Sequence, residues 1–192
     1  MSRKRIARIA AGVALGAGSI FMVIAPGWAS AAPVATVNCT VSAPTTGCGS
    51  QDLQYGKYAL DVYQQNATYG NKIILWTRSN SDPAQDFIFR NYNGLGGSGG
   101  PDKTFEYAPN GRASGLCVSF PSTGLGTGAV LRTCNEGIWQ TFRPIAAGGS
   151  YVAWQNLASG YVAEDGAYGN QGTQIDQWVH NGGDNQNWKY VS

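Results

Sequence analysis

The sequence predicts an all-β fold made of three similar copies of one unit. A Gln followed two residues later by a large aromatic side chain occurs at Gln85-Asp86-Phe87, Gln140-Thr141-Phe142 and Gln186-Asn187-Trp188, at intervals of 55 and 46 residues. The intervals differ by nine residues, the length of the Gly-rich stretch 93–101, which we interpret as a loop inserted between the first two copies. From residue 32 onward helical periodicity is weak, and Gly and Pro separate short segments. A threefold repeat of about 45 residues predicts closure around a pseudo-threefold axis.

Residues 1–31 have the pattern of a secretory signal peptide. Four basic residues among the first eight precede an apolar run over residues 9–24, and Ala29-Ser30-Ala31 follows as a cleavage sequence. A membrane anchor is the alternative, but these sixteen residues are fewer than the roughly 20 that span a bilayer. We therefore expect cleavage after Ala31 and a soluble mature protein that is secreted into the extracellular space.

The charge balance argues against electrostatic partners. The chain has 13 Lys and Arg against 11 Asp and Glu, a net charge of +2, but Arg3, Lys4, Arg5 and Arg8 all lie in the predicted signal peptide. Without these four residues the net charge is −2. A body of that charge has no basic surface to neutralise phosphates, so we expect neither nucleic-acid binding nor membrane insertion.

The four cysteines suit an oxidising compartment, because thiols there tend to pair. Of the three possible pairings we favour Cys39 with Cys48 and Cys117 with Cys134, since each closes a short loop. The first pair falls in residues 32–50, an extension before the first copy, and the second contributes about 3 kcal/mol on the loop-entropy estimate. No C-x-x-C occurs and His180 is the only histidine, so we expect no metal and no cofactor.

Within each copy, two landmarks predict a β-hairpin. The copies open at Leu60-Asp61-Val62, Val118-Ser119-Phe120 and Ala163-Glu164-Asp165, and their midpoints are Leu75-Trp76, Leu131-Arg132 and Gln177-Trp178. The opening polar residue and the midpoint are separated by 15, 13 and 14 residues. These separations suit two strands joined by a Gly-containing turn such as Tyr69-Gly70-Asn71 or Tyr168-Gly169-Asn170.

The repeats resemble the ricin B-type lectins. The third copy reads Gln177-Trp178-Val179-His180-Asn181-Gly182-Gly183-Asp184-Asn185-Gln186-Asn187-Trp188, very similar to the family's Q-W-x-x-N-G-G-x-N-Q-x-W ending. The resemblance covers residues 51–192, with copies at about 51–92, 102–146 and 147–192. It implies a β-trefoil with three pseudo-symmetric repeats, a carbohydrate-binding function, and an intra-repeat disulfide where Cys117 and Cys134 lie.

In that family, each copy can form a shallow sugar pocket from an acid, a polar residue, an aromatic residue and an Asn before the signature Gln. A carboxylate accepts hydroxyl hydrogen bonds, and an indole covers the C–H face of a sugar ring. The third copy has the most complete set, namely Glu164, Asp176, Trp178, Asn185 and Gln186. Glu replaces the usual Asp there, and Asp176 stands where an amide is common, so two carboxylates share the predicted pocket.

The other two copies depart further from the family pattern. The first keeps Asp61, Trp76 and Gln85 but has Ile74 in the polar position and Ala84 in the Asn position, so we interpret its pocket as impaired. The second has neither an acid nor a stacking aromatic at its midpoint, so we interpret it as inactive. Its residues at these positions are Ser119, Val130, Arg132 and Trp139.

Structural roles compete with sugar binding at several of these positions. We expect Phe87, Phe142 and Trp188 in the core, and we expect the three signature Gln residues to brace the backbone. For Trp76 and Trp178, half-buried barrel packing remains the alternative to ligand contact. Glu164 beside Asp165 also suits a solvated strand end, and Asp61 also suits a turn cap.

The residue inventory favours a binding protein over an enzyme. One histidine and no unpaired cysteine leave little material for a catalytic triad, and Glu164 and Asp165 point to opposite faces of a strand. We therefore expect no enzymatic activity and expect a sugar, glycan or polysaccharide as the partner. The alternative is a protein-binding trefoil, such as a protease inhibitor or adhesion factor, whose partner is another secreted protein.

Overall fold

The computed structural model describes residues 46–53, 57–92, 96–166 and 169–191, with the backbone alone for residues 46–53. The predicted signal peptide, Cys39 and residues 32–45 of the predicted extension lie outside the described residues. No helix among the described residues is long and apolar enough to cross a membrane.

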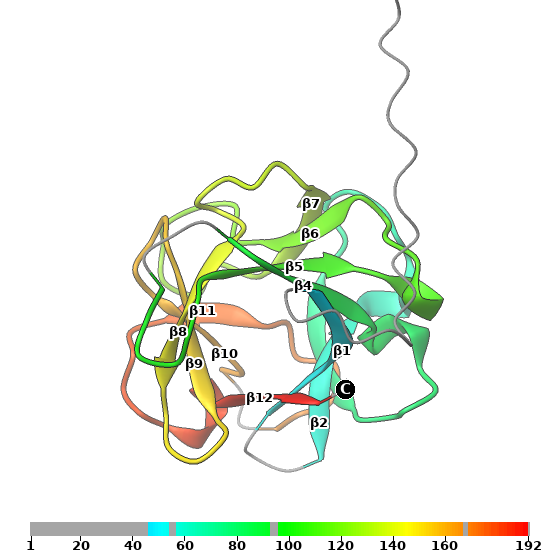
Figure 1. The fold of residues 1–192 in the computed structure, drawn as a ribbon. Helices are drawn as coiled ribbons and strands as arrows, with labels where there is room; N and C mark the ends of the chain where they lie inside the picture. The colour runs from blue at the N-terminus through cyan, green and yellow to red at the C-terminus, as the bar shows by residue number, and fades with distance from the viewer. Residues whose placement is uncertain (1–45, 54–56, 93–95, 167–168, 192) are drawn as a thin grey trace, which may run out of the picture. The chain divides into compact units, whose positions relative to one another are not determined.

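Six strands form a closed antiparallel barrel. Each pairs with the next in the series, and the last pairs with the first (Figure 1). The series is β1 (Thr46–Leu53), β4 (Phe87–Asn91), β5 (Lys103–Tyr107), β8 (Thr141–Ala146), β9 (Val152–Asn156) and β12 (Trp188–Val191). β1 begins at Thr46, so five of its residues lie in the stretch that we assigned to the extension. Closure leaves the barrel with no free edge strand.

The other six strands form three hairpins, one for each copy. They are β2 (Tyr58–Val62) with β3 (Ile73–Thr77), β6 (Leu116–Ser119) with β7 (Val130–Thr133), and β10 (Val162–Glu164) with β11 (Asp176–Trp178). The hairpins meet in a ring of backbone hydrogen bonds. The Ile73 N–H donates to the Ala129 carbonyl at 3.0 Å, and the Ala129 N–H donates to the Ile175 carbonyl at 2.7 Å. The Ile175 N–H donates back to the Ile73 carbonyl at 2.9 Å. This cyclic arrangement confirms the predicted all-β fold with three pseudo-symmetric repeats.

Short 3₁₀ turns link the strands. They are η1 (Tyr63–Gln65), η2 (Pro83–Gln85), η3 (Pro109–Gly111) and η4 (Asp184–Gln186). η2 and η4 end at a signature Gln, which directs that side chain inward just before β4 and β12.

The signature residues are structural, as predicted. Phe87, Phe142 and Trp188 are buried in one hydrophobic core between the barrel and the hairpins. Each signature Gln accepts a hydrogen bond from one backbone N–H and donates to one backbone carbonyl seven or eight residues earlier. In the order N–H donor and carbonyl acceptor, the partners are Ser79 and Thr77 for Gln85, Asn135 and Thr133 for Gln140, and Asn181 and Val179 for Gln186.

The Cys117–Cys134 disulfide is confirmed; its Cα atoms are 5.0 Å apart, and it links β6 to the residue that follows β7. The predicted pairing of Cys39 with Cys48 lies outside the described side chains.

The described part of the Gly-rich insertion packs against β8. The Gly99 N–H donates to the Pro144 carbonyl at 3.1 Å, and a Cβ atom on Gly97 would lie 2.1 Å from the same oxygen. The close backbone approach therefore requires glycine at position 97.

Candidate functional site

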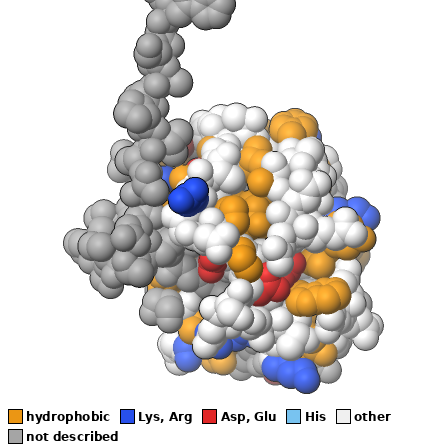
Figure 2. Space-filling view, turned by 90° about the vertical axis from the view of Figure 1, so that its right-hand side faces the viewer, with side chains coloured by type: hydrophobic (Ala, Val, Ile, Leu, Met, Phe, Trp, Pro, Cys, Tyr) orange, Lys and Arg blue, Asp and Glu red, His pale blue; other side chains and the backbone are white. Residues whose placement is uncertain are grey.

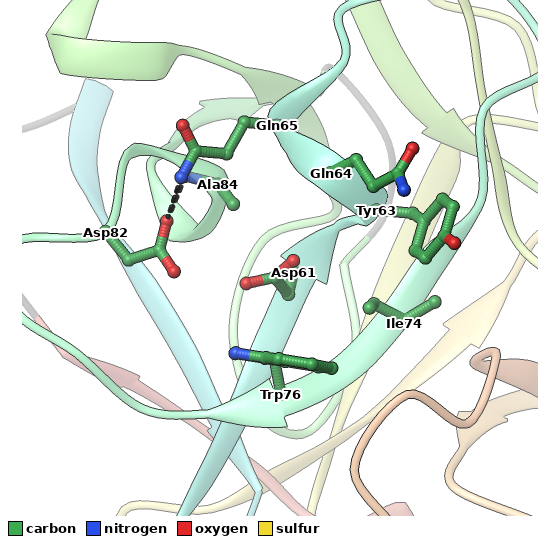
Figure 3. Close-up of a pocket in the computed structure, with 8 residues that line it drawn as sticks. All are labelled: Asp61, Tyr63, Gln64, Gln65, Ile74, Trp76, Asp82 and Ala84. Carbon is green, nitrogen blue, oxygen red and sulfur yellow. Dashed lines mark hydrogen bonds between the residues drawn. The ribbon is translucent and has the colours of Figure 1, made fainter.

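The first repeat contains a pocket with a volume of about 380 Å³. Its walls come from the end of β2, the η1 turn, β3 and the η2 turn, so the hairpin and both flanking turns contribute (Figure 3). The lining residues are Asp61, Tyr63, Gln64, Gln65, Ile74, Trp76, Asp82 and Ala84.

Asp61 lies at the centre of this pocket, between Asp82 on one side and Tyr63 on the other (Figure 3). Its side chain is almost fully buried, with 4% exposure, and accepts a hydrogen bond from Gln85 Nε2 at 3.2 Å. Burial raises the pKa of Asp61 to about 6, the Gln85 hydrogen bond opposes this shift, and the negative charge of Asp82 adds to it. The pocket therefore holds a poorly solvated carboxylate that a ligand can stabilise.

Two aromatic side chains border the same space. Trp76 is 39% exposed and Tyr63 is 44% exposed, so each ring is open to a ligand on part of its surface. The indole also lies against the third repeat, because a Cβ atom on Gly172 would be 3.8 Å from Trp76 Cζ3. Ile74 and Ala84, which stand where the repeat pattern has a polar residue and an Asn, are buried and give the pocket an apolar floor.

Asp82 is a second acid in the pocket, and sequence analysis missed it. Its Oδ1 accepts hydrogen bonds from the Ala84 N–H at 3.0 Å and from Gln65 Nε2 at 3.1 Å, which joins η1 to η2. The Asp82-Pro83 pair is typical of the start of a helical turn, and this signal could have located the acid. Tyr63 and Gln65 were also missed, because the left-handed backbone at Gln64 and Gln65, with φ of 55° and 54°, turns the chain around the pocket.

The third repeat brings together the acid and amide side chains predicted there. Strand register places Glu164 opposite Asp176, just as it places Asp61 opposite Ile74 in the first repeat. Glu164 Oε2 accepts hydrogen bonds from Gln186 Nε2 at 2.8 Å and from Asn185 Nδ2 at 3.4 Å. Burial raises the pKa of Glu164 above its ordinary value. The two hydrogen bonds lower this pKa, and the negative charge of Asp165 raises it.

Asp176 and Trp178 occupy the same face of β11. Trp178 is 41% exposed, close to the exposure of Trp76. Asp176 Oδ1 is buried without a hydrogen-bond partner among the described residues. Burial raises the pKa of Asp176 to about 6, with further increases from the charges of Glu164 and Asp165. The loop that follows β10 includes residues 167–168, which lie outside the described residues.

The second repeat has the same hairpin register at these positions but different chemistry. Ser119 is opposite Val130 in the strand register, and its hydroxyl donates to the Trp139 carbonyl at 3.4 Å. Arg132, at the position of Trp76 and Trp178, places its guanidinium 5.7 Å from the centre of the Tyr69 ring. The second repeat therefore has neither the carboxylate nor the indole that the other two repeats have at these positions.

Solved structures share this arrangement of strands. A designed 3-fold symmetric protein, ThreeFoil, matches with a TM-score of 0.66 and 22% identity over 76% of this chain and 98% of that one. The Rhizoctonia solani agglutinin matches with a TM-score of 0.62 and 18% identity over 79% of this chain and 98% of that one. Together with the closed barrel and three hairpins, these likenesses decide the architecture. The fold is a β-trefoil.

Part of an enzyme also shares the β-trefoil. An exo-β-1,3-galactanase from Clostridium thermocellum matches with a TM-score of 0.64 and 23% identity over 79% of this chain and 31% of the enzyme. The chain therefore spans about a third of that enzyme's length. No protein-family model matches the chain, and no curated protein sequence does so either.

Proposed function

We propose that the protein is a secreted carbohydrate-binding protein whose sugar sites lie in the first and third repeats of the trefoil. One observation supports this most strongly. Asp61 and Glu164 are buried acids held by a signature Gln, and each lies on a strand paired with one that presents a half-exposed Trp. The second repeat keeps the signature Gln without the acid, so this Gln braces the fold even where the acid is absent.

The two kinds of group match the two faces of a sugar ring. An indole offers a flat apolar surface to ring C–H groups, and a carboxylate accepts hydrogen bonds from hydroxyl groups. In the first repeat, Asp61 and Trp76 supply these groups at one pocket. In the third repeat, Glu164, Asp176 and Trp178 supply them, with Asn185 and Gln186 orienting Glu164.

A polysaccharide suits this arrangement better than a free sugar. A shallow site binds weakly, but two sites that engage one polymer gain about 10² to 10⁴ in overall affinity when the geometry permits. The sites proposed in the first and third repeats are two such sites. The structural likeness to an agglutinin supports the same proposal at the level of the fold.

We further propose binding without catalysis. Asp61 and Glu164 are held by neutral amides, an arrangement that suits hydrogen bonding to a retained sugar. Incubating bound polysaccharide with the protein and measuring released reducing ends tests this part, because any turnover above the background rate contradicts it.

The test of sugar binding is a glycan array with a polysaccharide pull-down on the mature protein. Trp76→Ala and Trp178→Ala are compared with Trp139→Ala, since Trp139 has the same 39% exposure as Trp76 but lies in the second repeat. We expect weaker binding in the first two variants and unchanged binding in Trp139→Ala. Absence of glycan binding by the folded wild type would overturn the proposal and favour the protein-binding alternative.

A further inference from the structure

We propose that the first-repeat pocket selects a sugar with an unsubstituted amino group and holds the ammonium between Asp61 and Asp82. This inference rests on the proposed carbohydrate-binding function and names the chemical class of its ligand. It assigns a specificity role to Asp82, which lies outside the acid, polar, aromatic and Asn positions of the repeat pattern.

The composition of the pocket is the first argument. Its described lining contains two carboxylates and no Lys, Arg or His. The positions where an amide or other polar group would serve a neutral sugar hold Ile74 and Ala84, both almost fully buried. Two positions that are polar in the repeat pattern are therefore apolar here, and Asp82 adds a second acid to the lining. The lining then has two negative charges and no positive one, which favours a cation.

Each acid keeps one oxygen available for a ligand. Asp61 uses Oδ2 for its bond from Gln85, and its Oδ1 has no hydrogen-bond donor among the described residues. Asp82 uses Oδ1 for its bonds from Gln65 and Ala84, and its Oδ2 likewise has none there. An ammonium has three N–H donors, so it can satisfy both open oxygens and still donate elsewhere.

The electrostatics of neighbouring groups agree with a negative pocket. The charge of Asp82 contributes to the raised pKa of Asp61. The pKa of Tyr107, in the core near η1, is raised to about 12 by burial and by the charges of Asp61, Asp82 and Asp86. A bound cation relieves this repulsion, whereas a neutral sugar leaves it in place.

The aromatic side chains complete the recognition of an amino sugar. Trp76 and Tyr63 are each more than a third exposed, so the indole can cover the C–H face while the ammonium also interacts with a ring face. On the face drawn in Figure 2, acidic groups lie beside hydrophobic side chains. A metal ion is less suited, because the described residues contain no group of three or more His, Cys, Asp or Glu side chains able to hold one.

The experiment is calorimetric titration at pH 7 with EDTA present. The ligands are methyl glycosides of 2-amino-2-deoxyglucose and 2-amino-2-deoxygalactose, their N-acetyl derivatives and the parent neutral sugars. We expect an amino form to bind at least tenfold more tightly than its N-acetyl and neutral counterparts.

Asp82→Asn is the decisive variant, because the new amide oxygen can still accept the bonds from Ala84 and Gln65. It should remove the preference for the amino form and retain neutral-sugar binding. The matched control is Asp184→Asn, which removes one charge from an exposed side chain of η4 outside the first-repeat pocket and should retain the preference.

The outcomes separate the two proposals. Equal binding of amino, N-acetyl and neutral sugars overturns the inference and leaves the carbohydrate-binding function intact. If the protein binds none of these sugars and no glycan on the array, both proposals are overturned. An amino preference that persists in Asp82→Asn overturns the role of Asp82.

Discussion

The first and second repeats share a paired hairpin and a signature Gln, yet only the first has an acid and a Trp at the pocket positions. Gln85 and Gln140 make equivalent backbone hydrogen bonds, and Phe87 and Phe142 are both buried in the core. At the pocket, Asp61 is replaced by Ser119, and the Trp76 position holds Arg132. One set of residues therefore maintains the trefoil, and a different set forms the proposed sugar sites.

The largest effect should come from a framework residue in the second repeat. Phe142→Ala removes a ring that stacks on Phe105 at 4.8 Å and contacts Phe120. We expect a loss of about 3–5 kcal/mol in the free energy of unfolding, measured by urea denaturation. A loss below 1 kcal/mol would mean that the second repeat does not share the common core.

The second-repeat disulfide should have the next largest effect. Replacing Cys117 and Cys134 together by Ser removes a cross-link between residues 17 apart in sequence, which lowers the stability by about 3 kcal/mol on the loop-entropy estimate. Because the first-repeat pocket lies on another hairpin, its ligand affinity should be unchanged in the folded variant. Calorimetric melting and ligand titration of the same preparation measure both quantities.

Asp61→Asn tests a residue that we assign to the proposed sugar site and not to the framework. Loss of a charge-assisted hydrogen bond should weaken ligand binding by about 1.5–3 kcal/mol, roughly ten- to more than a hundredfold. Ser119→Ala, at the corresponding position of the second repeat, should leave affinity unchanged. Comparable losses in both variants would contradict the difference between the repeats.

The pH dependence of stability should separate residues that stabilise the fold from residues assigned to the ligand. The pKa of Asp61 is raised to about 6 from 3.8, so the folded protein binds a proton more readily than the unfolded chain. The contribution of protonated Asp61 to the free energy of unfolding is therefore fully present below pH 4 and is lost as the pH rises through 6. The groups that face it are Asp82 and Gln85, with Asp86 and Tyr107 nearby.

Because Asn cannot ionise, Asp61→Asn should be more stable than the wild type at pH 7, by about 1–2 kcal/mol, and equally stable near pH 4. Urea denaturation at both pH values measures this difference. A variant that is less stable at pH 7 would show that the carboxylate stabilises the fold instead of serving the ligand.

The smallest effect should be a gain of binding in the second repeat. Ser119→Asp combined with Arg132→Trp restores the acid and indole on a backbone that is already in place. We expect weak binding, because Val130 and Trp139 still occupy the remaining pocket positions. An increase in polysaccharide retention would support the separation of framework and site, and unchanged retention would show that more of the pocket must be rebuilt.

Sequence analysis predicted the framework because its physical causes recur three times. The Gln and aromatic signature, the hairpin spacing and the Cys117–Cys134 pair each depend on local sequence, and the structure confirms them. Asp82 and Tyr63 escaped notice because they reach the pocket through two left-handed residues in η1 and a cap at η2, which occur in one repeat only. The packing of Gly97 against Pro144 also joins segments distant in sequence, which no local pattern reveals.

The measurement that tests the central claim most directly is an NMR titration. A saccharide that the protein binds is added to the ¹⁵N-labelled protein, and the indole N–H resonances are recorded. We expect the signals of Trp76 and Trp178 to shift in a saturable manner. Those of Trp139, in the second repeat, and Trp188, buried in the core, should stay in place. A shift of Trp139 alone, or saturable binding that moves neither Trp76 nor Trp178, would contradict the assignment of the sugar sites.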